Sequence, residues 1–414
     1  MNKLFWALLA GWLVFLTGLR PYPTSAQSPH TVAPGDTWTA LAYRYNLLEE
    51  ALRAANPQMN RQRQPVIGGT VIIPDGATSQ NGRLLRTNDG DLLAAAVALN
   101  VSPWALALQN NLPSPYRPTL YRPLYRPGGA EPPKDWPPGV TRLELSQAPA
   151  RPGQALGARG ELWGEGAITA ALDGNEMDTF QNGRRFVALT GTGAFYGSGQ
   201  PELTLRVDDG PLWSQPWQFI DRDDWIYQQI TLTGEAAQID QESIAQERER
   251  LNAIWQQNSP APQWQTAYQL PITDYLSITS PFGARRSYNG GPYRSYHEGI
   301  DFSAYGGTPV MAPAAGTVVL AEKLYVRGYA VIIDHGLGIY SGFYHMSEIG
   351  TAVGEQVQPG QIVGAVGTTG LSTGNHLHWD LLVDGVWVDG QTWLEQGMGC
   401  WILEGWGEAC ESSG

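Results

Sequence analysis

The histidines near residue 380 restrict the fold of the C-terminal part of this chain more than any other feature. In the segment His376-Leu377-His378-Trp379-Asp380 the two histidines are two residues apart. A strand points such a pair to one face, whereas a helix points it in nearly opposite directions. Upstream, His297 and Asp301 are four residues apart, with Gly299 between them, which disfavours a helix. We therefore expect an antiparallel sheet that brings His297, Asp301 and His378 to one point.

Two imidazoles and one carboxylate form a ligand set that suits Zn²⁺ and leaves one position for water. Zn²⁺ in such a site lowers the pKa of bound water toward ~7 and polarises a scissile carbonyl. His376 is the same-face neighbour of His378, and His345 lies in another strand-like run, 342–347. Either of these two further histidines could take a proton or bind a developing oxyanion. The sequence contains no His-Glu-x-x-His pattern, so the glutamate base of that metalloprotease class is missing.

In this region, from Leu270 to Leu394, the chain resembles the lysostaphin-type (LytM) zinc metallopeptidases. The motifs that carry the resemblance are Ser280-Pro281-Phe282-Gly283-Ala284-Arg285-Arg286, His297-x-x-x-Asp301, His345, His376-x-His378 and Pro359-Gly360-Gln361-Ile362-Val363-Gly364. The resemblance implies that the metal ligands are His297, Asp301 and His378 and that the catalytic residues are His345 and His376. It also implies an antiparallel-β domain with a groove, at residues 268–396, that cleaves peptide bonds in peptidoglycan.

Three positions depart from the pattern of that family. Met346 stands where leucine is usual, Asp380 where glutamate or glutamine is commoner, and Gly390 where proline often follows Asp389. None of these departures removes a metal ligand. The shorter Asp380 side chain could weaken a hydrogen bond that supports the ligands.

Other residues near these motifs have simpler interpretations. We interpret His335, in Asp334-His335-Gly336, as a turn residue, and Asp384-Gly385 is typical of a hairpin turn. Glu298 could act as an acid or base, but its place on the strand points it away from the metal ligands. Arg285 and Arg286 either shape a substrate groove, meet substrate carboxylates or form a solvated surface pair.

Composition excludes several classes of protein. The 414 residues carry a net charge of −13, which argues against a nucleic-acid binder because such a protein needs a basic surface. A hydrophobic content of 42% is enough for packed cores and argues against wholesale disorder. Cys400 and Cys410 are the only cysteines, too few for a disulfide framework. In an oxidising compartment we expect these two to pair, with free thiols as the alternative.

Residues 1–26 are interpreted as a signal peptide. Lys3 provides positive charge, Leu4 to Leu19 is apolar, and Thr24-Ser25-Ala26 offers small residues for cleavage. The apolar run of about 16 residues is short for a membrane-spanning helix of ~20, so cleavage is favoured over an uncleaved N-terminal anchor. We therefore expect a secreted protein that works outside the cytoplasm and is associated with the cell wall.

Residues 30–76 follow a strand, helix, helix, strand pattern. They contain Gly35-Asp36-Thr37, an apolar-periodic stretch at 40–43 and the β-branched run Val71-Ile72-Ile73. Asp36 and Thr37 are expected to cap the first helix. The segment resembles the LysM module, which implies a βααβ fold and binding of N-acetylglucosamine-containing glycans such as peptidoglycan. His30 is interpreted as a structural residue of this module.

A degenerate LysM-like repeat is predicted at residues 84–129. A shift of 55 residues aligns Gly90-Asp91 and Asn111 with their counterparts in the first copy. The second copy is expected to lose its closing strand, because residues 116–127 repeat Tyr-Arg-Pro instead. Its glycan binding is therefore left open, and in both copies the Gly-Asp pair could simply cap a helix.

The remaining boundaries follow from composition. Residues 130–139 form a Pro-rich linker. Residues 140–234 contain short alternating apolar and polar runs, the last of them at 225–232. These runs predict an immunoglobulin-like β-sandwich that acts as a spacer. Residues 235–258 predict a helical linker with a solvated charged flank, and residues 397–414 a C-terminal tail. The predicted fold class is therefore multidomain and mainly β.

These features predict an exported zinc endopeptidase that binds peptidoglycan and hydrolyses its peptide cross-links. One alternative is a LytM-like regulator that has lost activity and activates a separate cell-wall amidase. Another is a wall-anchored adhesin whose terminal domain only binds. The complete set of candidate ligand and catalytic positions favours the enzyme. The residues leave open whether a D-alanyl–diaminopimelate link or a glycine-rich bridge is cut, and whether His345 or His376 is the base.

Overall fold

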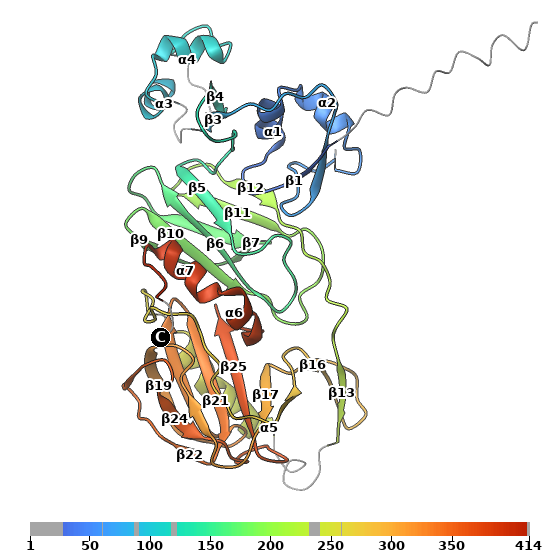
Figure 1. Cartoon of the computed structure of the whole chain (residues 1–414), viewed down its shortest axis with the longest axis vertical. Helices are drawn as coiled ribbons and strands as arrows, with labels where there is room; N and C mark the ends of the chain where they lie inside the picture. Colours follow the sequence, from blue (N-terminus) through green and yellow to red (C-terminus); the bar gives the residue numbers. More distant parts are fainter. Residues whose placement is uncertain are drawn as a thin grey trace, which may run out of the picture.

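The chain forms an elongated molecule in which the parts follow one another along the long axis. The structure is a computed structural model, and it describes residues 28–59, 61–86, 91–116, 122–231, 241–257 and 259–411. Figure 1 shows two small modules at one end, a β-sandwich in the middle and a larger β domain at the other end. The mainly β fold class is as predicted. The predicted signal peptide lies outside the described residues.

The first module contains two strands and two helices. These are β1 (Ser28–Thr31), α1 (Trp38–Tyr45), α2 (Glu49–Ala54) and β2 (Thr70–Ile73). The strands pair antiparallel, and Trp38, Leu41 and Leu52 are among the buried side chains that join the helices to them. Burial of these apolar groups is what holds so small a module together.

The turn before α1 is held by two polar residues with different tasks. Thr37 caps the helix, as predicted, because its side-chain oxygen accepts a hydrogen bond from the amide of Ala40. Asp36 was predicted to share that role, but its carboxylate accepts a hydrogen bond from the Ala33 amide and lies 2.9 Å from Nε2 of His30. Asp36 therefore fixes the turn rather than the helix end, and His30 has the structural role predicted for it.

The second module repeats the order of the first. Its elements are β3 (Gly82–Leu85), α3 (Leu92–Ala98), α4 (Pro103–Gln109) and β4 (Leu124–Pro127). β4 pairs antiparallel with β3, so the prediction that this copy loses its closing strand is wrong. The prolines at 123 and 127 concealed the strand, because proline within a run argues against a strand, whereas here it lies at the strand ends.

A side-chain amide ties helix to strand in the same way in both modules. Asn56 donates to backbone carbonyls of α2 and β2 and accepts from a β2 amide. Asn110 makes the same three hydrogen bonds with α4 and β4. Asn110, rather than the predicted Asn111, is therefore the counterpart of Asn56.

Residues 130–139 contain no helix or strand, yet they pack against three parts of the molecule. The buried carboxylate of Asp135 accepts hydrogen bonds from Thr37 of the first module and from Arg86 of the second. The indole of Trp213, in the sandwich, donates to the carbonyl oxygen of Asp135. The Pro-rich segment thus joins the modules to the sandwich instead of standing free between them.

Two four-stranded antiparallel sheets form the sandwich, in the orders β5-β6-β10-β9 and β12-β11-β7-β8. Their strands are β5 (Val140–Leu145), β6 (Ala155–Leu162), β7 (Ile168–Leu172), β8 (Asn175–Glu176), β9 (Asp178–Asn182), β10 (Arg185–Gly191), β11 (Glu202–Val207) and β12 (Trp213–Pro216). Buried residues such as Phe186 and Leu205 fill the space between the sheets. The predicted last strand of the sandwich, 225–232, instead supplies β13 (Tyr227–Ile230), which pairs parallel with β15 (Arg285–Tyr288) of the next domain.

The C-terminal domain is built on a large antiparallel sheet in the order β14-β17-β25-β21-β20-β19-β23, with β26 paired to β25. These strands are β14 (Ser277–Ser280), β17 (Gly299–Ser303), β19 (Gly316–Leu324), β20 (Gly328–Gly336), β21 (Ile339–Met346), β23 (Gln356–Val357), β25 (His376–Val383) and β26 (Val386–Val388). Two smaller sheets contain β16 (Ser295–Tyr296), which pairs with β15, and β18 (Pro309–Met311), β22 (Glu348–Ile349) and β24 (Ile362–Ala365). Asp384 and Gly385 both have positive φ and form the predicted hairpin turn between β25 and β26.

Three helices complete the domain. Helix α5 (Gln241–Trp255) buries Leu251 and Ile254 against the sheet, beside Ile332 and Tyr340, so its apolar face belongs to the core of the domain. The C-terminal helices are α6 (Gly390–Gln396) and α7 (Met398–Trp406). Buried side chains of α7 pack with both the sandwich and the C-terminal domain. Cys400 and Cys410 form a disulfide, as expected from the sequence.

Candidate metal centre

Three neighbouring strands carry most of the predicted site residues. The register pairs Asp301 of β17 with His378 of β25, and on its other side His378 faces Tyr344 of β21. His376 and His378 share one face of β25, while the residues between and after them are buried on the other face. His297 lies two residues before β17. Both β25 histidines therefore lie on the same side of the sheet, as their two-residue spacing predicted.

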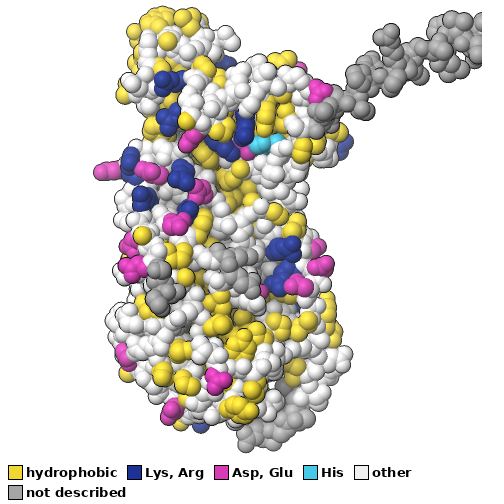
Figure 2. Space-filling view, in the orientation of Figure 1, with side chains coloured by type: hydrophobic (Ala, Val, Ile, Leu, Met, Phe, Trp, Pro, Cys, Tyr) yellow, Lys and Arg dark blue, Asp and Glu magenta, His cyan; other side chains and the backbone are white. Residues whose placement is uncertain are grey.

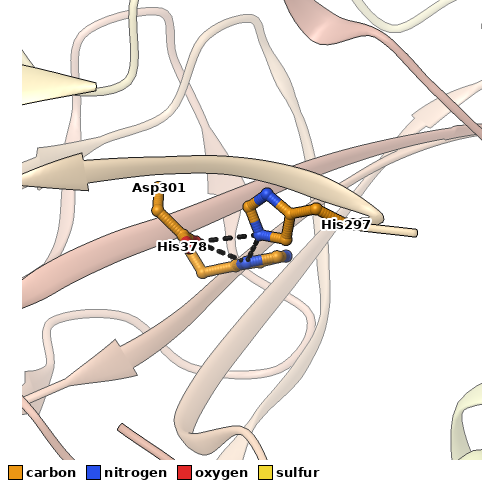
Figure 3. Close-up of side chains that lie close together, drawn as sticks. All are labelled: His297, Asp301 and His378. Atoms are coloured by element: carbon orange, nitrogen blue, oxygen red, sulfur yellow. Dashed lines mark hydrogen bonds and ion pairs between the residues drawn. The ribbon is translucent and has the colours of Figure 1, made fainter. Parts of the chain in front are cut away.

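The side chains of His297, Asp301 and His378 converge on one point (Figure 3). Nδ1 of His378 lies 2.8 Å from Oδ1 of Asp301 and 2.9 Å from Nε2 of His297. Nε2 of His297 lies 3.0 Å from the same carboxylate oxygen. Among the described residues, no other group of three or more His, Cys, Asp or Glu side chains has donor atoms close enough together to hold a metal ion.

Gly299 allows the two strands to approach at this point. A Cβ atom at residue 299 would clash with the carbonyl oxygen of Trp379 and would lie 2.7 Å from Nε2 of His378. Any side chain there would therefore push the imidazole out of place. The glycine between His297 and Asp301 is thus explained by close packing beneath the ligands.

The hydrogen bond on the far side of His297 sets which ring nitrogen faces the site. Nδ1 of His297 lies 3.1 Å from the carbonyl oxygen of Pro281, which can only accept, so Nδ1 carries the proton. In the neutral ring Nε2 then presents a lone pair to the carboxylate of Asp301. A lone pair facing a carboxylate oxygen at 3.0 Å is unfavourable unless a cation lies between them. This arrangement fits a metal ion.

The protonation states of the other two residues also fit a cation. Burial would raise the pKa of Asp301, but the neighbouring imidazoles of His297 and His378 outweigh it and hold that pKa well below its usual range. Burial lowers the pKa of His378 to about 3, so this imidazole is neutral at pH 7. Neutral imidazole and ionised carboxylate are the forms that bind metals. Two such nitrogens and one such oxygen form a donor set typical of Zn²⁺.

The two remaining predicted histidines stand beside this group. The rings of His345 and His376 have centroids 4.8 Å apart, and Nε2 of His376 lies 3.9 Å from Oδ1 of Asp301. Each ring donates from Nδ1 to a backbone carbonyl at 2.8 Å, that of Thr369 for His345 and that of Gly374 for His376. Both Nε2 atoms are therefore left as acceptors when the rings are neutral.

His345 is held by its backbone as well as by its ring. It has a φ of +62°, a left-handed conformation that non-glycine residues rarely adopt. Its amide donates to the carbonyl oxygen of Arg327. Burial, together with the nearby His376, lowers the pKa of His345 to about 4. The ring is thus fixed in place and neutral at pH 7, so its Nε2 is free to accept a proton.

Arg286 reaches the second oxygen of the candidate ligand Asp301. One of its terminal nitrogens lies 3.6 Å from Oδ2 of Asp301 and donates to the hydroxyl of Ser280. Its Nε donates to the side chain of Gln228, a residue of β13. The sequence left the place of Arg286 open, and the structure puts it beside the candidate ligand Asp301. Gln228 was missed because its sequence neighbours showed only a strand pattern.

A buried charge network lies behind the site. Glu247 of α5 accepts hydrogen bonds from the Val326 amide at 2.6 Å and from Arg327 at 3.1 Å. The guanidinium of Arg327 also lies 3.5 Å from Glu298 and sits over the Tyr344 ring. Glu298 therefore points away from the candidate ligands, as predicted. No pattern in the sequence marked Glu247, because the charges of this helix suggested only a solvated face.

Two further sequence interpretations can be compared with the structure. His335 was interpreted as a turn residue, but it lies inside β20, fully buried, and bonds the Ala315 carbonyl and the Ser341 hydroxyl. The short loop that follows at 337–338, and not His335 itself, makes the turn. Asp380 accepts a hydrogen bond from the Trp387 indole at 3.0 Å, so this shorter carboxylate is supported by a partner on β26.

The antiparallel sheet carries two imidazoles and one carboxylate, with two further histidines beside them. This arrangement is typical of a metallopeptidase-type centre. Residues 295–390 match the model of peptidase family M23, and residues 30–74 match that of the LysM domain. The chain therefore carries a LytM-type M23 peptidase domain and a LysM domain.

Named relatives share the C-terminal region. A DD-carboxypeptidase/endopeptidase of Neisseria meningitidis is 40% identical over 111 residues, which is 27% of this chain and 25% of the relative. A peptidoglycan DD-endopeptidase of Vibrio cholerae is 36% identical over 122 residues, which is 29% of this chain and 28% of the relative. A Pseudomonas aeruginosa crystal structure assigned to peptidase M23 is 27% identical, covers 60% of this chain and 96% of its own, and has a TM-score of 0.43. The matched region spans about a quarter of the length of the curated relatives.

Proposed function

We propose that this chain is an exported, cell-wall-associated zinc endopeptidase that hydrolyses peptide cross-links of peptidoglycan. The observation that carries the proposal is the convergence of three metal-binding donor atoms within 3.0 Å of one another, with two backbone-anchored histidines beside them. The match to peptidase family M23, and relatives named as peptidoglycan DD-endopeptidases, support the substrate class.

The proposed roles follow from the positions of the ligand atoms and of the ring nitrogens that can accept a proton. His297, Asp301 and His378 hold Zn²⁺, which when bound activates water and polarises the scissile carbonyl. His345 and His376 present acceptor nitrogens and serve as the groups that take a proton and bind the developing oxyanion once protonated. Of the two, His345 is the better candidate for the base, because its backbone and ring are both anchored.

The LysM domain is proposed to bind the glycan part of the same polymer. Holding the peptidase on its substrate raises the local concentration of cross-links at the metal centre. The second module keeps the βααβ order and the anchoring asparagine of the first, so its fold is intact. Its sequence offers no further argument for glycan binding.

The experiment is to incubate the protein with purified peptidoglycan and to identify released fragments by mass spectrometry, with and without a chelator. The proposal expects cross-linked peptides to be cleaved, chelation to stop cleavage and Zn²⁺ to restore it. The fragment masses would distinguish a D-alanyl–diaminopimelate link from a glycine-rich bridge. A protein that binds the polymer, retains zinc and releases nothing would instead be the amidase regulator or the adhesin.

A further inference from the structure

The second module exposes an apolar surface at the far end of the molecule. Val97 of α3 is 81% exposed, and Trp104 and Leu108 of α4 are 53% and 72% exposed. Leu93 is four residues before Val97, and Trp104 is four residues before Leu108, so each helix shows one apolar stripe to solvent. Figure 2 shows hydrophobic side chains gathered at this end, with dark-blue basic side chains between it and the sandwich.

The charge of this module is opposite to that of the whole chain. Residues 82–127 contain five arginines and two aspartates, a net charge of +3 in a chain of −13, and one of the arginines, Arg86, is paired with the buried Asp135. No charged residue lies between Leu92 and Tyr116, the segment that forms the apolar surface. Arg83 and Arg126 face each other across β3 and β4. An apolar tip followed by arginines is the order in which a protein meets first the acyl region and then the anionic headgroups of a lipid surface.

The helix geometry is suited to lying on a membrane. In the described part of the chain no single helix is long and apolar enough to cross a bilayer. Helices α3 and α4 reach the required length and hydropathy only when taken together, and they are bent by 105° relative to each other. Two short helices with this bend expose two apolar pairs, Leu93 with Val97 and Trp104 with Leu108, without spanning the bilayer. Trp104 adds an amphipathic ring of the kind enriched at membrane interfaces.

We propose that the outer surface of the second module, formed by Leu93, Val97, Trp104 and Leu108, docks on an anionic lipid membrane. Self-association through the same surface is disfavoured, because it would bring two modules of net positive charge together. A sugar ligand is disfavoured too, because aliphatic side chains flank the tryptophan where a carbohydrate would need hydrogen-bonding groups. The membrane would hold the molecule at its module end, with the peptidase domain at the opposite end.

The test is flotation with lipid vesicles, using protein without residues 1–27 because their apolar run would itself bind lipid. This form keeps every described helix and strand. Vesicles of phosphatidylglycerol and phosphatidylcholine are compared with phosphatidylcholine alone. The patch variant combines Val97→Ser, Trp104→Ser and Leu108→Ser. The matched control combines Leu48→Ser, Leu212→Ser and Val353→Ser, three similarly exposed apolar residues elsewhere. Circular dichroism and thermal unfolding check that both variants fold.

The proposal expects the unmodified protein and the control to float with the anionic vesicles. The patch variant should lose binding at least tenfold, and 0.5 M salt should weaken binding of the unmodified protein several-fold. The proposal is overturned if the unmodified protein does not float or if both variants bind equally. It is also overturned if the patch variant changes only the oligomeric state or the binding of isolated glycan strands.

Discussion

Nε2 of His297 and Nδ1 of His378 lie 2.9 Å apart, although 81 residues separate them in sequence. Both atoms also lie within 3.0 Å of Oδ1 of Asp301. When all three atoms present lone pairs they repel each other at this distance, and a cation among them removes the repulsion. The metal centre should therefore affect the stability of the C-terminal domain as well as its chemistry.

Metal removal should lower the melting temperature of the C-terminal domain. A ligand that binds only the folded state adds about 2.7 kcal/mol when its concentration is 100 times its Kd. We expect calorimetry to show a Zn²⁺-dependent rise in melting temperature for the unmodified protein. Asp301→Asn, which removes the carboxylate at the centre, should abolish that rise. An equal rise in this variant would mean that the stabilising zinc binds elsewhere.

Gly299→Ala should disrupt the centre through steric contact alone. The added methyl group would clash with the Trp379 carbonyl and with His378. Overpacking of this kind costs typically about 1–3 kcal/mol, and here it also displaces a ligand. We expect a lower melting temperature and zinc affinity reduced at least tenfold, measured by competition with a chromophoric chelator. Gly164→Ala is the control, since nothing lies within 4 Å of its added Cβ.

Glu247→Gln should weaken turnover from a position remote from the ligands. Glu247 fixes the loop of Val326 and Arg327, and the Arg327 carbonyl binds the His345 amide. Removal of one partner of a buried ion pair costs about 3 kcal/mol. We expect kcat to fall about tenfold, with KM unchanged, and Glu247→Asp to restore part of the loss. Glu249→Gln, an exposed position on the same helix, should leave both constants unchanged. A change in KM alone would contradict this positioning role.

Stability should fall in acid because of His335. Burial lowers its pKa from 6.5 to about 4 in the folded state. Between these values the unfolded chain binds more protons than the folded chain, so the free energy of unfolding decreases as the pH falls from 6.5 toward 4. The loss is on the order of 3 kcal/mol. We expect His335→Gln to show a smaller loss than the unmodified protein in chelator-treated samples unfolded at pH 7 and pH 4.5. Parallel curves would assign the acid sensitivity to other groups.

Short-range pattern was sufficient for the strand that carries the β25 histidines. Periodicity of two residues fixes which side chains share a face, and this information is local. The same reasoning failed where distant contacts decide the structure. The segment around Tyr227 has the pattern of a sandwich strand, but pairing with β15 places it in the peptidase domain. Likewise, Glu247 has the pattern of a solvated helix residue until Arg327 is brought against it.

In the candidate site, too, local pattern predicted some features whereas distant contacts decide others. The five residues His297, Asp301, His345, His376 and His378 could be selected from spacing and family resemblance, and the structure brings them together. Which ring nitrogen of His297, His345 and His376 faces the site could not be predicted, because this depends on the carbonyl groups of Pro281, Thr369 and Gly374. Loops supply these acceptors, and loop conformation leaves little trace in residue periodicity.

The central claim is that His378 binds zinc whereas His376 acts on the substrate. The most direct measurement is zinc content, by mass spectrometry of the purified protein, together with cleavage of purified peptidoglycan, for His378→Ala and His376→Ala. We predict that His378→Ala loses both zinc and activity, and that His376→Ala keeps zinc and loses activity. Full zinc occupancy in His378→Ala, or equal activity in both variants and the unmodified protein, would contradict the account.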